Sequence, residues 1–172
     1  MICDSTILII FSKLNKLDLL LKIFDNLLIP EAVYNEVVEK GINNPDSFLI
    51  KELVEKKQII IKALELKWKN KSEFLRETYK LGNGESEAIS LSLQEKKFLL
   101  IDDKLARKIA RLYEVKTQGS LRVLLLAFKS KLLTENEIKK ILVEMTLNNN
   151  FRLSAGIISK FWILFDKLKG KK

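Results

Sequence analysis

Apolar residues recur along the chain in short runs, separated by stretches with helical spacing. Runs of strand length occupy Leu27–Ile29, Ile59–Ile61 and Phe98–Ile101. Between such runs the apolar side chains return every three or four residues, as they do over 16–26. Short apolar strands that alternate with helices are typical of a parallel sheet covered on both faces. The pattern therefore predicts an α/β fold with a central parallel sheet flanked by helices.

The first ten residues allow two interpretations. The apolar run Ile7–Ile10 either extends a strand that spans the whole stretch, or a short strand ends at Asp4 and a helix begins with Ser5 or Thr6 as its cap.

Proline and glycine mark other boundaries. Pro30 and Gly41 stand at the two ends of a predicted helix, and Gly82-Asn83-Gly84 is the clearest break in the chain. The remaining predicted elements are helices over 48–56, 85–94, 103–112, 119–131 and about 153–168, a helix capped by Thr134 with Glu137 in the capping-box position, a strand within 115–117, and a helix-rich insertion over 62–81.

The length and composition fit one globular domain. The 172 residues are 47% apolar, and six glycines and two prolines leave no room for a flexible linker. We expect residues 1–135 to form the main domain and residues 136–172 to form extra C-terminal helices packed on it. No apolar run is long enough to cross a bilayer, and the N-terminus lacks the basic start of a signal peptide. The expected location is the cytoplasm.

The chain has no histidine and a single cysteine, Cys3. These counts exclude Ser-His-Asp and Cys-His catalysis, imidazole metal ligands, an internal disulfide and a cysteine-rich zinc site. The reactive groups of a hydrolase would have to be carboxylates, hydroxyls, Lys or Arg. Carboxylates most naturally hold Mg²⁺ or Mn²⁺, because these hard cations prefer oxygen ligands.

The positive charge is unevenly distributed. The chain has 31 basic and 22 acidic side chains, a net charge of +9, and residues 119–172 contribute 11 basic against four acidic ones. A basic excess favours a polyanionic partner through counterion release, although charge alone also fits a merely soluble, lysine-rich protein.

Several carboxylates fall at predicted element ends. Asp4 follows the first apolar stretch, and Asp102 and Asp103 follow the strand predicted over 98–101. Since ligands bind outside the carboxyl ends of parallel strands, these three can converge. The helical acids Glu36, Glu85 and Glu87 complete a cluster that a divalent cation would neutralise, and such a cation could activate water against a phosphodiester.

Each of these acids also has a purely structural interpretation. Asp4 and Asp103 can cap helices, and Glu85 can favour a helix N-terminus through the helix dipole. Glu36 can be a solvent-facing helix residue. The order of the acids and their strand-end placement favour the functional interpretation only when they are taken together.

Several ordered motifs resemble those of the PIN-domain family. They are Asp4-Ser5-Thr6, the segment 30–37 (PEAVYNEV), the segment 84–89 (GESEAI), the segment 99–104 (LLIDDK) and the segment 119–125 (GSLRVLL). The chain looks most like the subgroup related to VapC-type toxins, and the resemblance covers about residues 1–135.

The resemblance implies a metal-dependent single-strand RNA endonuclease that is the toxin of a toxin–antitoxin pair. By position in the motifs, it implies catalytic roles for Asp4, Glu36, Glu87 and Asp103, a metal site that also draws on Glu85 and Asp102, and Mg²⁺ or Mn²⁺ as cofactor. It further implies RNA, a cognate antitoxin and a second copy of the chain as partners. Lys104, Arg107 and Arg122 could guide the phosphate backbone.

The sequence departs from the family pattern in three places. The third acid is Glu where many members have Asp, Ile101 stands where Thr or Ser is usual, and the 62–81 stretch is long and charged. Two alternatives therefore stay open. One is a catalytically inactive PIN-fold module that binds RNA or a protein partner. The other is a phosphatase-like hydrolase, which is disfavoured because Thr6 breaks the Asp-x-Asp pattern common in such enzymes.

Overall fold

The computed structural model describes residues 1–41, 45–147 and 153–170, and within them five short strands form one parallel sheet. The strand order is β3-β2-β1-β4-β5, which confirms the predicted central parallel sheet flanked by helices. The strands are β1 (Ile2–Cys3), β2 (Leu27–Ile29), β3 (Ile59–Ile61), β4 (Leu99–Leu100) and β5 (Thr117–Gln118).

The chain divides into two compact units, residues 1–120 and 121–172. The predicted domain boundary at residue 135 remains a prediction. Helices of the first unit are α1 (Ser5–Lys13), α2 (Leu17–Ile23), α3 (Glu31–Tyr34), the π-helical turn η1 (Asn35–Glu39), α4 (Pro45–Glu55), α5 (Leu66–Tyr79), α6 (Asn83–Glu95) and α7 (Lys104–Leu112). Those of the second are α8 (Ser120–Lys129, whose first residue belongs to the first unit), α9 (Glu135–Leu147) and α10 (Ala155–Lys169).

The N-terminal ambiguity resolves in favour of a short strand followed by a helix. β1 ends at Cys3, and Asp4 is the N-cap of α1, with its Oδ2 accepting a hydrogen bond from the Thr6 N–H at 3.2 Å. The cap is thus Asp4 and not Ser5 or Thr6, because an extended backbone at residue 4 lets its short carboxylate reach the free N–H groups of the first turn. This geometry places an acid directly at the carboxyl end of the central strand.

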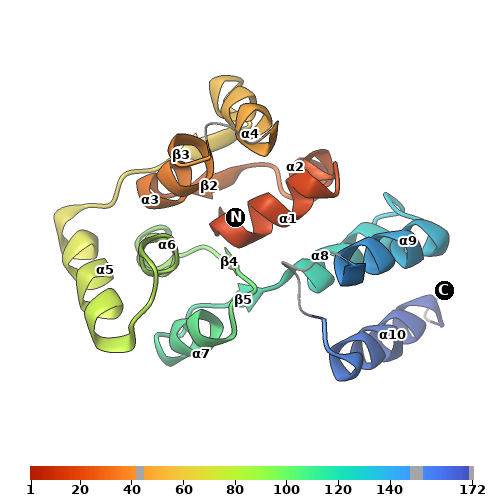
Figure 1. The fold of residues 1–172 in the computed structure, drawn as a ribbon. Coiled ribbons are helices and arrows are strands. Elements are labelled where there is room, and N and C mark those ends of the chain that lie inside the picture. Colours follow the sequence, from red (N-terminus) through yellow and green to blue (C-terminus); the bar gives the residue numbers. More distant parts are fainter. Residues whose placement is uncertain (42–44, 148–152, 171–172) are drawn as a thin grey trace. The chain divides into compact units, whose positions relative to one another are not determined.

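The sheet separates two groups of helices in the first unit. One face carries the core formed with α5, α6 and α7, in which Ile2, Leu28 and Leu99 of the strands pack with Ile89 and Ile109. Figure 1 shows these three helices along one side of the sheet and α1 and α4 along the other. The three inner strands β1, β2 and β4 consist entirely of buried apolar residues, as covered parallel strands do, whereas the outer strands β3 and β5 are only partly buried.

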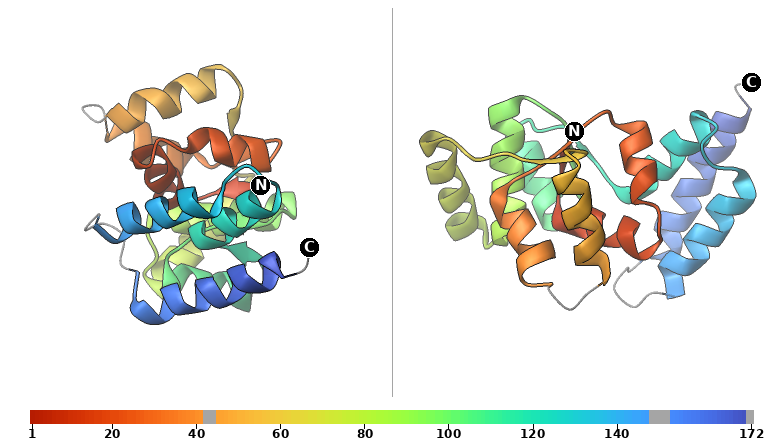
Figure 2. Two further views of the ribbon diagram at one scale, coloured as in Figure 1. Left: turned by 90° about the vertical axis from the view of Figure 1, so that its right-hand side faces the viewer. Right: turned by 90° about the horizontal axis from the view of Figure 1, so that it is seen from above.

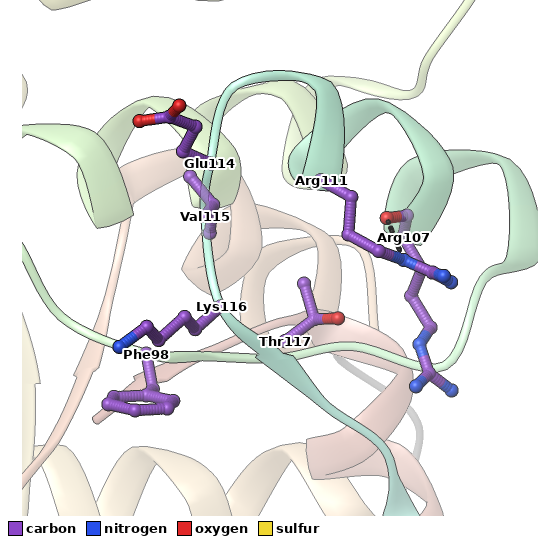
Figure 3. A pocket seen from close by; sticks show the side chains of 7 residues that line it. All are labelled: Phe98, Arg107, Arg111, Glu114, Val115, Lys116 and Thr117. Carbon is purple, nitrogen blue, oxygen red and sulfur yellow. Dashed lines mark hydrogen bonds between the residues drawn. The ribbon is translucent and has the colours of Figure 1, made fainter.

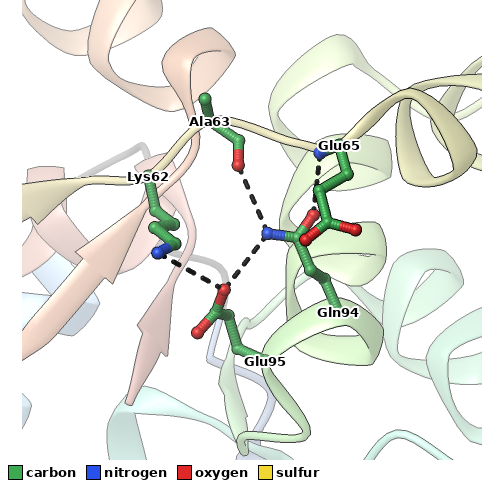
Figure 4. Close-up of polar contacts among 5 residues, drawn as sticks. All are labelled: Lys62, Ala63, Glu65, Gln94 and Glu95. Atoms are coloured by element: carbon green, nitrogen blue, oxygen red, sulfur yellow. Dashed lines mark hydrogen bonds and ion pairs between the residues drawn. The ribbon is translucent and has the colours of Figure 1, made fainter.

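The predicted insertion 62–81 consists of an extended connection and α5. α5 packs against α6, as the right-hand view of Figure 2 also shows, and the buried Ser72 and Ser86 hydroxyls of the two helices form a hydrogen bond at 3.0 Å. The end of α6 also holds the connection from β3 to α5. The Gln94 side chain accepts a hydrogen bond from the Glu65 N–H at 2.9 Å and donates to the Ala63 carbonyl at 3.3 Å (Figure 4).

Replacing Gln94 with alanine should lower the free energy of unfolding by about 1 kcal/mol, because the side-chain hydrogen bonds to the connection are lost. Urea unfolding would measure the change. The exposed Gln58→Ala is the matched control, for which we expect almost no change. Equal stability of the two variants would show that the Gln94 contacts do not hold the connection.

The second unit is held by an aromatic cluster. The Phe128 and Phe165 ring centroids lie 4.3 Å apart, and Trp162 stands edge-on to both Phe161 and Phe165. Phe161 and Phe165 are buried, so these C-terminal aromatic residues form core. Thr134 and Glu137 form the predicted capping box of α9, with the Thr134 N–H donating to the Glu137 carboxylate at 2.7 Å.

No helix in the described part of the chain combines the length and the apolar character needed to span a membrane.

Candidate active site

The strand register brings the predicted acids to one edge of the sheet. β1 pairs in parallel with β2 and β4, and the Asp4 N–H donates a hydrogen bond to the Leu100 carbonyl at 3.0 Å. Asp4 therefore lies beside the chain that leads directly into Asp102 and Asp103. α6, which carries Glu85, packs against β1 and α3. The chain segments that carry Asp4 and the Asp102-Asp103 pair thus lie side by side at the carboxyl ends of β1 and β4.

Asp4 is the deepest of these acids. Its side chain is fully buried, and its Oδ1 has no hydrogen-bond partner among the described residues. Burial raises the pKa of Asp4 to about 7, against the lowering effect of the Thr6 hydrogen bonds, and the negative charges of Glu85 and Glu36 raise the pKa further. The carboxylates of α6 and η1 are therefore close enough to Asp4 to repel it.

Glu36 reaches the same place from η1. This π-helical turn continues α3 without a break, and no signal in the sequence distinguishes it from an α-helix. The Glu36 Oε1 accepts a hydrogen bond from the Gly84 N–H at 3.0 Å. A Cβ at residue 84 would lie 2.4 Å from the Glu36 Oε2, so only glycine lets the carboxylate approach the start of α6 this closely. The Gly-Asn-Gly segment thus has two roles: it begins α6, and its Gly84 leaves room for the Glu36 carboxylate.

Glu85 belongs to this group of acids. Its Oε2 accepts a hydrogen bond from the Gly82 N–H at 2.9 Å, which closes a capping interaction at the start of α6. Burial raises the pKa of Glu85, and so do the charges of Asp103 and Glu36. These mutual effects define an acid cluster of four side chains, Asp4, Glu36, Glu85 and Asp103.

The two consecutive aspartates after β4 point to different helices. The Asp103 Oδ1 accepts a hydrogen bond from the Ala106 N–H at 2.7 Å and caps α7. The Asp102 Oδ1 accepts from the Ser120 N–H at 3.0 Å, and a Cβ at Gly119 would lie 2.4 Å from this oxygen. Burial raises the pKa of Asp102, while the Ser120 hydrogen bonds and then the Arg107 charge lower it. Asp102 thus faces Gly119 and the start of α8.

Glu87, which the family motif assigns as the third catalytic acid, points elsewhere. Its Oε2 accepts a hydrogen bond from the Ala32 N–H at 3.0 Å, in the first turn of α3. It also lines a polar cavity of about 200 Å³ between α5, α6 and α3, together with Lys69 and Arg76. Glu85, two residues earlier on the same helix, is therefore the α6 acid that interacts with the other acids, and Glu87 lies in a separate polar environment.

Every one of these carboxylates accepts a hydrogen bond from a backbone N–H at or near a helix N-terminus. The structural and functional interpretations of the acids are therefore compatible, since a carboxylate that accepts a hydrogen bond from a helix N-terminus has its negative charge partly offset there and can still serve a ligand. Across residues 1–41, 45–147 and 153–170, no three His, Cys, Asp or Glu side chains are gathered tightly enough to hold a metal ion as they stand.

The chemistry of the acid cluster nevertheless fits a hard cation. Its donors are all carboxylate oxygens, and the Asp4 Oδ1 is a buried oxygen without a hydrogen-bond partner in the part of the chain that the structure describes. Mutual repulsion of the acids would be relieved by a bound divalent cation.

Of the basic residues predicted to guide a phosphate backbone, two flank the acid cluster. Lys104 directly follows Asp103, and an Arg107 Nη1 lies 3.2 Å from the position that a Gly119 Cβ would take, beside the Asp102 carboxylate. Arg122 lies in the second unit.

Comparison with known proteins places nearly the whole chain in one family match. A family model described as PIN domain matches residues 1–167, which is nearly the whole chain. No curated protein matches the chain. The match extends beyond the 1–135 range over which the sequence motifs resemble the family.

Proposed function

Because the chain belongs to the PIN-domain family, whose members are typically nucleases, we propose that it is a Mg²⁺- or Mn²⁺-dependent endonuclease acting on single-stranded RNA. The observation that carries this proposal is the burial of Asp4 near Glu36 and Glu85, with one Asp4 oxygen that no group in the described residues hydrogen-bonds. A buried carboxylate that its neighbours repel lowers the stability of the folded protein. A functional role for these acids, namely binding a cation that acts on a phosphodiester, explains why this loss of stability is tolerated.

Asp4, Glu36, Glu85 and Asp103 would hold the metal. A bound divalent cation supplies Lewis-acid polarisation of the phosphate and lowers the pKa of water. The protein itself positions the acids: β1 and β4 fix the two aspartates, and the Gly84 and Gly82 N–H groups orient the two glutamates. Lys104 and Arg107, beside the acids, would bind the phosphate backbone of the substrate.

Biologically, we propose that the protein acts in the cytoplasm as the toxin of a toxin–antitoxin pair, as a homodimer restrained by a cognate antitoxin protein. The support for this is the likeness of its ordered motifs to the VapC-type subgroup.

Cleavage of a labelled single-stranded RNA in Mg²⁺ tests the activity. The wild-type chain should cut the RNA, and addition of EDTA or the substitution Asp4→Ala should stop it. Equal cleavage by the wild type and Asp4→Ala would contradict the proposal.

A second candidate is an inactive PIN-fold module that binds RNA or a protein. The observation in its favour is that the described carboxylates are spread over helix N-termini and form no ready metal site. Metal binding separates the two candidates.

Mn²⁺ should stabilise the protein if it is a nuclease. At about a hundred times its Kd, a ligand specific for the folded state adds about 3 kcal/mol, which corresponds to a rise in Tm of about 5–10 °C for a chain of this size. Thermal unfolding with and without Mn²⁺ measures the shift, and Asp4→Asn should reduce it. An unchanged Tm for the wild type would favour the inactive module.

A further inference from the structure

α7 carries a stripe of basic side chains along one face. Lys104, Arg107, Lys108 and Arg111 are spaced i, i+3, i+4 and i+7, and the helix contains no acidic residue. The opposite face, with Ile109, is buried against the sheet. No ion pair with a carboxylate within 4.0 Å joins any of these four cations in the described residues. The charges of the exposed Lys104, Lys108 and Arg111 are therefore available to an anionic partner, whereas Arg107 lies beside the Asp102 carboxylate and lowers its pKa.

The stripe leads from the acid cluster to a pocket. It starts next to Asp103, and its first and last residues lie roughly 10 Å apart along the helix axis. Arg107 and Arg111 at its far part line a cavity of about 490 Å³ between α7 and the strand β5, which is at the end of the sheet order. The cavity is thus connected to the acid cluster by a continuous row of cations.

The other wall of the pocket combines an aromatic ring with a cation. Phe98 is 43% exposed although it precedes a buried strand, and the Lys116 Nζ lies 5.5 Å from the centre of its ring. Figure 3 shows Lys116 and Phe98 on one side of the pocket and the two arginines on the other, with Thr117 between them. The pocket lining holds three cations and a single acid, Glu114.

An exposed ring beside several cations has the chemistry of a site for single-stranded nucleic acid. Bases stack on an aromatic face, and phosphates bind Lys and Arg. A base in a duplex is already stacked between its neighbours, so an exposed ring in the wall of a cationic pocket favours an unpaired strand. An acidic protein segment would use the cations but not the ring.

We infer that this basic stripe and pocket bind the RNA strand on its way to or from the acid cluster, with phosphates on Arg107, Arg111 and Lys116 and a base on Phe98. The inference rests on the proposed function, because it takes the strand to be the substrate. It assigns to the first unit a binding surface that begins beside the acids and extends beyond them to Arg111, Phe98 and Lys116.

Binding of a fluorescein-labelled ten-nucleotide uridine RNA in EDTA, measured by fluorescence anisotropy, tests the inference without cleavage. The double variant Arg111→Ala/Lys116→Ala removes two exposed cations and should weaken binding on the order of tenfold. Since each phosphate contact contributes about 0.7 to the slope of log affinity against log salt for single strands, the slope should fall by about 1.4 in magnitude. Phe98→Ala should weaken binding about fivefold or more through lost stacking.

The matched control is Lys13→Ala/Lys51→Ala, which removes two exposed lysines from α1 and α4 and should leave affinity within about twofold. Thermal unfolding of all variants checks that they are folded. Equal affinity of the pocket variant and this control would overturn the inference even if the wild type cleaves RNA. Loss of binding in the pocket variant would support it even if no cleavage is found, and then only the proposed function fails. Displacement of the RNA by polyglutamate as readily as by unlabelled RNA would assign the pocket to an acidic protein and overturn it.

Discussion

Replacing Glu85 with glutamine should lower metal-dependent RNA cleavage by about a hundredfold or more, whereas Glu87→Gln should keep it within a few-fold of the wild type. The sequence motif assigns the third catalytic acid to Glu87. The structure instead couples Glu85 electrostatically to Asp4, Glu36 and Asp103, and turns the Glu87 carboxylate to the Ala32 N–H.

The two substitutions are well matched. Glutamine keeps a side-chain oxygen that can accept the Gly82 N–H bond at Glu85, or the Ala32 N–H bond at Glu87, so both variants should fold. Each substitution removes only the negative charge of the carboxylate, which is what binding of a divalent cation requires. Initial rates of cleavage at saturating Mg²⁺, with thermal unfolding as a check, give the comparison. If Glu87→Gln were much less active than Glu85→Gln, the third catalytic acid would be Glu87, as the family motif implies.

The pH dependence of stability should also differ strongly between the wild type and Asp4→Asn. The folded state holds the Asp4 proton up to a pKa of about 7, whereas the unfolded state releases it near 3.8. The folded state therefore binds more protons over this window, and stability falls as the pH rises. The contribution of Asp4 is present in full below about pH 4 and is lost once the pH passes about 7. At 1.36 kcal/mol for each pKa unit, it amounts to about 4 kcal/mol as an upper value.

Asparagine stays neutral at every pH and is itself a good N-cap, so Asp4→Asn should keep the cap of α1. In EDTA, its stability should match that of the wild type near pH 4 and exceed it by a few kcal/mol at pH 8. Glu85 and Asp102, whose pKa values burial also raises, add a decline of the same sign to both proteins, and the difference between the two profiles reports Asp4 together with its repulsion of Glu85 and Glu36. Urea unfolding across pH 4–8 would measure it, and parallel profiles would show that Asp4 is not a protonated, repelled group in the metal-free protein.

These two predictions address different properties of the same acid cluster. The cleavage comparison asks which α6 carboxylate serves the reaction, and the pH profile asks whether the cluster is electrostatically strained without a cation. If the pH profile holds while cleavage is absent, the burial of Asp4 would stand as a property of a PIN-fold module that has lost its activity.

The hydrophobic pattern was sufficient to locate most of the fold. β2 and β3 have the predicted bounds, because runs of three apolar residues flanked by proline or polar chain are typical of short strands in a parallel sheet, although Ile60 in the middle of β3 is 37% exposed. The strand predicted within 115–117 lies instead at Thr117–Gln118. Short, half-polar edge strands carry little apolar signal, so their register depends on pairing with a neighbour, here β4.

The sequence by itself determined which chemistry is available: without histidine and with a single cysteine, carboxylates are the main candidates for metal ligands, and the order of the motifs that contain them resembles that of the PIN-domain family, to which the chain belongs. Tertiary structure alone decided which carboxylates meet. Residues 85 and 87 are two apart on a helix and so about 200° apart around its axis, and only the packing of α6 against β1 and α3 selects the side that faces Asp4. In the same way, the stripe on α7 can be read from its spacing, but its continuity with Phe98 and Lys116 arises only where β4, β5 and α7 pack together.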